Sequence, residues 1–290
     1  MVCQVDRLSR TFPASIRSVL EDLPESLDKT YEQTLLGIDK EKREYAQRLF
    51  KCLLVSIRPL RIEELAETFA VRFDAATPPS FNEDFRPPDA EEAILSACSS
   101  LIAIVDREDG RIVQFSHFSV KEFLTSERLK TAEERLSYYH ITPEPAHTIL
   151  AYITLSVLLR LDDKIDRNSI AHFHLAPYAA RYWVDHAKFK DVSSRIQGAM
   201  ERLFDPTMPH FAAWIWLYDI DRHWMESMSS IHPTRPEAGP LYYASVRIRS
   251  FGEAPSCRSF PRRQWPRRFA HDSLTCCLGQ GTFRSGIAAP

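Results

Sequence analysis

The sequence predicts a mainly α-helical chain: a winged helix with a β-hairpin, followed by a helical bundle or short α-superhelix and a disordered tail. Three observations predict this class. Apolar residues recur at helical spacing over most of the chain, glycine is scarce at 8 of 290 residues, and one strand–turn–strand pattern follows three helical segments. A hydrophobic content of 44% supports a core, and the length allows about two domains.

The N-terminal region, residues 1–38, is expected to consist of helices broken at Pro13 and Pro24. The last of these helices carries Tyr31 and Leu35. The family resemblance described below implies that residues 1–38 are the C-terminal helices of a preceding domain.

The next two helices are expected to form the start of the winged helix. The first covers 40–57, with Asp39 as its N-cap, and ends before Pro59. Its apolar positions predict one buried face: Tyr45, Leu49, Phe50, Leu53, Leu54 and Ile57. The second helix begins at Arg61 and reaches about Val71.

A proline-rich stretch, 77–88, then predicts a loop. A third helix is expected over 89–99, because its first turn carries acids that favour the positive end of the helix dipole. Strands follow at 101–105 and 111–116, joined by a turn at Asp109-Gly110.

Three helices followed by a hairpin is the order of a winged helix, which we place at 39–130. A last helix, 120–126, closes it. Ser119 is expected to cap that helix, with Glu122 three residues on as its capping-box partner. Three apolar residues of this segment are expected in the core: Phe118, Phe123 and Leu124.

The second half predicts a helical bundle over 140–230, because aromatic residues are dense along four helical patterns. The expected helices cover 143–161, 168–187, 192–204 and 209–226.

Residues 231–246 are expected to be a linker and the start of an ankyrin-like repeat. The stretch PLYYAS at 240–245 is similar to the repeat opening T-P-L-H-x-A. One repeat alone cannot bury its apolar face.

The tail, 247–290, differs in composition from the rest. It holds eight arginines against Glu253 and Asp272, a net charge of +6, whereas the whole chain carries −2. We expect it to be disordered. Its Arg, Pro, Ser, Gly and Cys content is typical of an out-of-frame translation, so our hypothesis is that the true frame continues into ankyrin repeats after Ser245.

Charge and motifs disfavour several function classes. A net charge of −2 predicts no bulk attraction to nucleic acid or membrane. The third helix and first strand, 87–106, hold four acids and no Lys or Arg, which would repel DNA phosphates. A winged-helix DNA-binding regulator stays open as the alternative, as does an RNA-binding role for the basic tail.

Catalytic sequence motifs are also lacking. The sequence contains no GxxxxGK[ST] phosphate loop and no GxSxG nucleophile elbow, so we expect no enzyme and no cofactor of its own. His172 and His174 are spaced poorly for a metal, and no CxxC pair occurs. No apolar run reaches the roughly 20 residues of a membrane span. We expect a cytoplasmic protein with Cys52 and Cys98 buried.

His117 lies where the hairpin meets the last helix, and two roles stay open for it. It could be a half-buried histidine that caps the helix. It could instead donate a hydrogen bond to a diphosphate oxygen of a nucleotide held by a neighbouring domain.

The chain resembles fungal NACHT–ankyrin proteins, which are signal-transduction ATPases with numerous domains (STAND). The resemblance covers about residues 1–246. It rests on these stretches: VCQVDRL (2–8), LPESLDKTYEQTLLGI (23–38), RPLRIEELAE (58–67), AILSACSSLIAIV (93–105), RIVQFSHFSVKEFL (111–124), EPAHTILA (144–151) and PLYYAS (240–245).

The resemblance implies a winged helix of the GPI inositol-deacylase type that folds back on a NACHT domain, the domain that binds ATP or ADP. It implies that His117 touches the diphosphate. It also implies a two-state switch linked to fungal non-self recognition, with other proteins as partners. The domain's name suggests a lipid-modifying hydrolase as a third class, but that class needs the absent nucleophile elbow.

Overall fold

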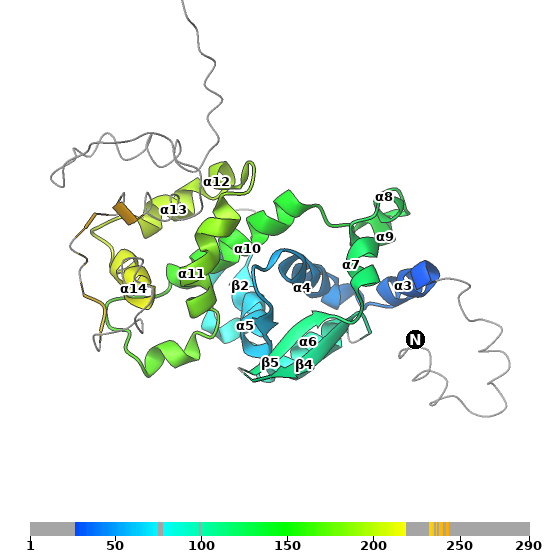
Figure 1. The fold of residues 1–290 in the computed structure, drawn as a ribbon, viewed down its shortest axis with the longest axis horizontal. Helices are drawn as coiled ribbons and strands as arrows, with labels where there is room; N and C mark the ends of the chain where they lie inside the picture. Colours follow the sequence, from blue (N-terminus) through cyan, green and yellow to red (C-terminus); the bar gives the residue numbers. More distant parts are fainter. Residues whose placement is uncertain are drawn as a thin grey trace, which may run out of the picture. The chain divides into compact units, whose positions relative to one another are not determined.

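The computed structural model describes residues 27–74, 78–98, 100–108 and 110–218, together with 232–234, 236, 238–239 and 242–243. These residues divide into two compact units (Figure 1). The first combines the described residues up to Phe69 with 86–146. The second combines 70–85 with the described residues from His147 onward. The helices expected before residue 27, most of the ankyrin-like segment, and the tail at 247–290 lie outside the described residues.

The first unit is the winged helix. Its elements, in chain order, are α3 (Leu27–Leu36), the 3-10 turn η2 (Lys40–Lys42), α4 (Arg43–Val55), β1 (Leu60–Arg61), α5 (Ile62–Glu67), the 3-10 turn η3 (Thr68–Ala70) in which the unit boundary falls, α6 (Ala90–Cys98), β4 (Ile102–Arg107), β5 (Gly110–Phe115), α7 (Phe118–Leu124), α8 (Glu127–Lys130) and α9 (Glu134–Ser137).

Strand β5 lies between β1 and β4 in a three-stranded antiparallel sheet. Val113 pairs with Leu60 on one side and with Ile104 on the other. Sequence analysis predicted the β4–β5 hairpin but missed β1, because two residues are too few for an alternating pattern. Gly110, at a φ of 125°, opens β5 opposite Arg107, in a region that residues with a side chain rarely adopt.

Helix α6 packs against both α4 and α5, which completes the helix-turn-helix. The expected buried face of α4 is partly wrong. Leu49 and Phe50 are fully buried, but Tyr45 and Ile57 are exposed. Ile57 is exposed because α4 ends at Val55, before the expected terminus.

The start of α4 also differs from the prediction. Asp39 precedes η2 and its side chain makes no capping hydrogen bond, so it does not cap α4. Its carboxylate instead lies 3.7 Å from the Lys42 ammonium group.

Two carboxylates are buried around α5, and each meets a guanidinium. Glu64 accepts hydrogen bonds from Arg58 at 2.8 and 2.6 Å and from the Arg61 backbone N–H at 2.8 Å. Glu67, 2% exposed, accepts from Arg86 at 3.1 and 2.7 Å. A buried charge is tolerated only when paired and hydrogen-bonded, so these contacts hold the ends of α5 in place.

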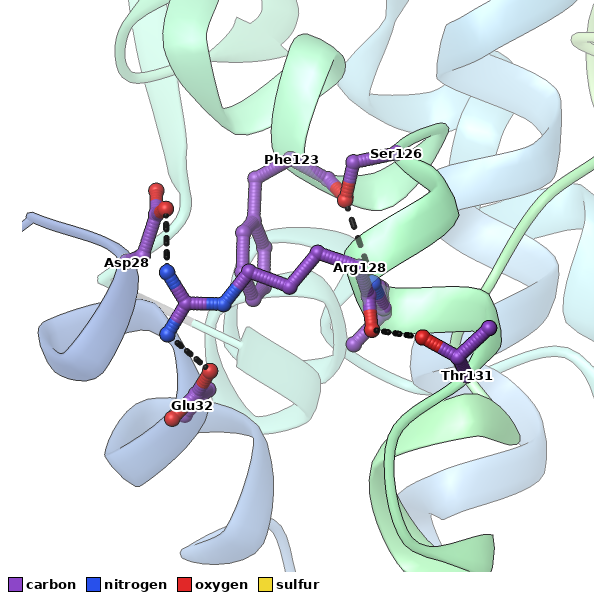
Figure 2. A network of polar contacts seen from close by, with 7 residues as sticks. Asp28, Glu32, Phe123, Ser126, Arg128 and Thr131 are labelled. Carbon is purple, nitrogen blue, oxygen red and sulfur yellow. Dashed lines mark hydrogen bonds and ion pairs between the residues drawn. The ribbon is translucent and has the colours of Figure 1, made fainter.

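Helix α3 belongs to the winged-helix unit, although we expected residues 1–38 to belong with a preceding domain. Figure 2 shows the Arg128 side chain of α8 reaching two carboxylates of α3. It donates to Asp28 at 2.8 Å and to Glu32 at 2.7 Å. Ser126 supports the turn that presents Arg128, because its hydroxyl accepts from the Leu129 N–H and donates to the Phe123 carbonyl.

The second unit is helical with one short hairpin. Its elements are β2 (Val71–Arg72), β3 (Ser80–Phe81), the 3-10 turn η4 (Glu83–Phe85), α10 (Pro143–Leu158, which begins in the first unit), the 3-10 turn η5 (Ser169–His172), α11 (Ala176–Ala187), α12 (Val192–Arg195), α13 (Gln197–Leu203) and α14 (Pro209–Leu217). The expected long helices at 168–187 and 192–204 are therefore each divided into two.

An insertion inside the winged helix, residues 70–85, packs with the second unit. Phe81 lies with its ring centroid 5.9 Å from that of Phe173, and the Ser156 hydroxyl donates to the Pro79 carbonyl at 3.0 Å. The expected loop at 77–88 thus contains a strand and a 3-10 turn. The prolines correctly excluded a helix, but they did not exclude an edge pairing two residues long.

Aromatic side chains form the core of the second unit. The rings of Trp183, Phe204 and Trp214 meet edge to face, with centroids 5.6 to 5.8 Å apart. The Trp214 indole donates to the Ala180 carbonyl at 3.0 Å, which joins α14 to α11.

We expect Arg86→Met to destabilise the winged helix by about 3 kcal/mol, because it removes the guanidinium that faces the buried Glu67 carboxylate. The described tryptophans, at 183, 214 and 216, all lie in the other unit. The measurement is hydrogen exchange of the slowest α5 amides. Lys130→Met is the control: its partner Glu127 is 78% exposed, so a cost of about 0–1 kcal/mol is expected. Equal protection in the two variants would contradict the role of Glu67.

Candidate functional site

The junction between β5 and α7 presents His117. The Ser116 N–H donates to the Leu101 carbonyl at 3.0 Å, which extends the hairpin pairing to the residue before His117. His117 itself is extended, with φ −152° and ψ 152°, and is the N-cap of α7. The three-stranded sheet therefore determines where this side chain emerges.

His117, and not Ser119, caps α7. The His117 Nδ1 accepts from the Ser119 backbone N–H at 3.3 Å. The expected serine cap is wrong because the imidazole occupies the capping position two residues earlier. The capping role proposed for the histidine is confirmed, but the ring is exposed and not half-buried.

The Ser119 hydroxyl joins His117 to α3. It lies 2.7 Å from His117 Nδ1 and 2.8 Å from the Tyr31 hydroxyl. Tyr31 is buried, and its ring centroid is 5.4 Å from that of Phe123. Nδ1 is thus engaged inside the unit, and no described residue forms a hydrogen bond with Nε2.

Phe118 was expected in the core but is 69% exposed. The buried face of α7 consists of Val120, Phe123 and Leu124. Phe118 precedes Val120 by two residues, which is about half a helical turn, so it points the other way. Its ring centroid lies 4.3 Å from that of His117. An exposed aromatic ring and an imidazole therefore stand together at one surface point.

Arg111 of the hairpin is paired with carboxylates. Arg111 of β5 donates to the Glu91 carboxylate of α6 at 2.7 and 2.8 Å, and it lies 3.6 Å from Asp106. The hydrogen bond from Arg111 is the main cause that lowers the pKa of Glu91. This guanidinium of the hairpin is thus already engaged by carboxylates.

Reactive groups of other kinds are limited among the described residues. No group of three or more His, Cys, Asp or Glu side chains in this part of the chain could hold a metal ion. Cys52 and Cys98 are buried as expected, and burial raises the pKa of the Cys52 thiol to about 12, which makes it a poor nucleophile. No described helix is long and apolar enough to cross a membrane.

A second polar cluster, which sequence reasoning missed, lies in the helical unit. The Nδ1 atoms of His147 and His186 are 2.9 Å apart, and His186 Nε2 is 2.9 Å from the Tyr178 hydroxyl. Burial, with a smaller effect of the His147 charge, lowers the pKa of His186 to about 3. No motif marks these residues, because their spacing of 39 positions carries no local signal.

Comparison with known proteins supports the winged helix. Residues 31–134 match the family described as "GPI inositol-deacylase, winged helix domain". A protein of Monascus ruber named "Azaphilone pigments biosynthesis cluster protein L" is 32% identical over 237 residues, or 78% of this chain and 49% of that protein. The chain therefore spans about half the length of this curated relative.

No solved structure matches the chain. The winged-helix part of the resemblance is thus confirmed, and its NACHT and ankyrin parts stay predictions.

The buried His186 predicts a pH dependence of the second unit. The unfolded histidine titrates near 6.5 and the folded one at about 3. Between these values the unfolded chain binds more protons, so stability is full above pH 6.5 and falls as the pH drops. From pH 7 to 5 the loss is about 2 kcal/mol. Urea unfolding followed by tryptophan fluorescence measures it. If His186→Gln shows the same loss, His186 is not its source.

Proposed function

We propose that this chain is a non-enzymatic regulatory and interaction fragment of a NACHT-type signal-transduction ATPase, because residues 31–134 form a winged helix of the GPI inositol-deacylase type. The winged helix packs on the nucleotide-binding domain, in cis or in trans. That domain holds ATP or ADP, and the packing controls a two-state switch in fungal non-self recognition. The setting is cytoplasmic.

The observation that carries this proposal is the exposed pair of His117 and Phe118. The Phe118 ring is 69% exposed and lies beside the imidazole. Such a pair can bind a protein surface that covers the ring and offers the imidazole a hydrogen-bond acceptor. Aromatic residues are enriched in the buried centres of protein–protein interfaces. The Nε2 of the histidine faces away from the network that engages Nδ1.

The electrostatics of the hairpin favour a protein over DNA as the partner. Specific DNA binding draws largely on Lys and Arg that neutralise phosphates. Here the Arg111 guanidinium contacts Glu91, and no Lys or Arg occurs between 87 and 106. No observation favours the DNA-binding alternative.

A switch requires a contact that forms in one domain arrangement and not in the other. A ligand shifts a two-state equilibrium only by the difference in its free energy of interaction with the two states. A hydrogen bond to a charged group contributes about 1.5–3 kcal/mol. A contact from His117 to a diphosphate in only one domain arrangement would therefore shift the populations by about ten- to a hundredfold.

The histidine contact predicts faster nucleotide loss. In a full-length relative with an ATPase domain, alanine at the position matching His117 should speed ADP release by about tenfold or more, because one hydrogen bond to a charged oxygen is lost. Release of labelled ADP measures this effect, and basal activity should rise with it. His174→Ala, at an exposed histidine of the helical unit, is the control. Unchanged ADP release would remove the sensor role.

The exposed ring predicts a separate loss of association. Phe118→Ser should weaken binding of this chain to the ATPase domain of a relative by about tenfold, because an interface anchor is removed. Its effect on folding stability should stay within about 0.5 kcal/mol, since the ring is exposed. Met208→Ser alters an exposed apolar residue of the helical unit and should leave binding unchanged. Titration calorimetry and thermal unfolding separate the two effects. Equal affinities for Phe118→Ser and the unaltered chain would contradict the docking surface.

A further inference from the structure

We propose that Tyr31 and Ser119 are positioning residues for His117. Together with the Ser119 backbone N–H, their two hydroxyls hold the imidazole as an acceptor at Nδ1 and a donor at Nε2. The Tyr31 hydroxyl contributes only while α3 lies against α7. This inference rests on the proposed function for what the Nε2–H group meets, but the positioning itself is a property of this chain.

The three groups form a continuous chain of hydrogen bonds. The Tyr31 hydroxyl lies 2.8 Å from the Ser119 hydroxyl, which lies 2.7 Å from His117 Nδ1. Tyr31 is only 8% exposed, and its ring contacts Phe123. These hydrogen bonds therefore connect the buried Tyr31 to the exposed His117.

The direction of these hydrogen bonds is decided by a backbone group. Two hydroxyls and an imidazole could in principle pass their hydrogens either way. However, the Ser119 backbone N–H also points at His117 Nδ1, at 3.3 Å, and a backbone hydrogen cannot rotate away. Nδ1 must then be an acceptor, because an N–H at that position would face another N–H. It follows that Ser119 donates to Nδ1, Tyr31 donates to Ser119, and the ring hydrogen is on Nε2.

The arrangement depends on a helix that is distant in the sequence. Tyr31 lies in α3, 88 positions before Ser119. Helix α3 is held to α8 by Arg128, whose guanidinium spans Asp28 and Glu32 (Figure 2). These two acids bracket Tyr31 along α3, so the contact that holds the helix also sets the place of the tyrosine.

A displacement of α3 would therefore alter His117 without touching it. If Tyr31 withdraws, Ser119 loses the donor that orders its hydroxyl and its preference for donating to Nδ1. The imidazole would then be held at Nδ1 mainly by the 3.3 Å contact from the Ser119 backbone N–H, and its Nε2–H group would be positioned less firmly.

The test is histidine nitrogen NMR of the whole chain, labelled at its ten histidines and without nucleotide. His117→Gln identifies the His117 signals. In the unaltered chain we expect one tautomer, with hydrogen on Nε2 and an Nδ1 resonance displaced by the hydrogen bonds that it accepts. Ser119→Ala removes the 2.7 Å hydroxyl contact and leaves only the 3.3 Å contact from the backbone N–H, so the Nδ1 resonance should move toward the position of free imidazole. Ser119→Thr, which restores the hydroxyl, should reverse this change.

Tyr31→Phe keeps the ring packed on Phe123 and should shift the Nδ1 resonance in the same direction, by less. Arg128→Glu, which repels Asp28 and Glu32, should reproduce the effect of Tyr31→Phe although residue 128 does not touch His117. Two controls should leave the signal unmoved: Thr125→Ala, which removes a hydroxyl at the other end of α7, and Lys130→Glu on α8.

The positioning of His117 by Tyr31 and Ser119 is refuted if Ser119→Ala or Tyr31→Phe leaves the His117 spectrum unchanged. It is also refuted if the unaltered chain shows hydrogen on Nδ1. Coupling to α3 is refuted if Arg128→Glu behaves as Lys130→Glu does. Both results are separate from the proposed function, because ADP release is measured in a relative with its ATPase domain. If the NMR results hold but alanine at the position matching His117 leaves ADP release unchanged, the positioning stands and the switch role is removed.

Discussion

The antiparallel pairing of β5 is the constraint on which the winged-helix unit depends. Val113 of β5 pairs with Leu60 of β1 on one side and with Ile104 of β4 on the other. Strand β5 therefore connects β1, which precedes α5, to the β4–β5 hairpin. The strand ends at Phe115, two residues before His117, and its last pairing is extended by Ser116. The exposed histidine therefore follows the strand that is paired on both sides. This pairing fixes the backbone direction at His117.

Burial distinguishes the ionisable groups of the described core from those at the surface. Glu64 and Glu67 stay next to arginines because a buried carboxylate needs a guanidinium close by. His186 has no such partner charge, and burial is the main cause of its low pKa. Arg111 and Glu91 pair at the surface, where the contact matters less for stability than for the charge that the hairpin offers to a partner.

Helix α3 changes how the candidate site is understood. A linear account of the sequence places a boundary near residue 38, so α3 would belong to whatever precedes the winged helix. The structure instead docks it on α7 and α8 through Tyr31 and Arg128. The histidine thus has two sources of restraint, the sheet through the backbone and α3 through the Ser119 hydroxyl. A regulatory histidine that responds to a neighbouring segment requires a connection of this kind.

The sequence by itself determined most of the longer helices, the β4–β5 hairpin and the place of His117 between β5 and α7, because helical periodicity, a turn dipeptide and a short motif are local signals. It also determined that Phe123 and Leu124 are buried, since both fit the spacing of one helix face. Only the tertiary structure decided that Phe118 is exposed, that β1 joins the sheet, that His147 meets His186, and that the histidine caps α7 in place of Ser119. The physical reason is that each of these depends on which surface a neighbour covers or on contacts between residues far apart in the chain, and neither leaves a periodic or local trace in the sequence.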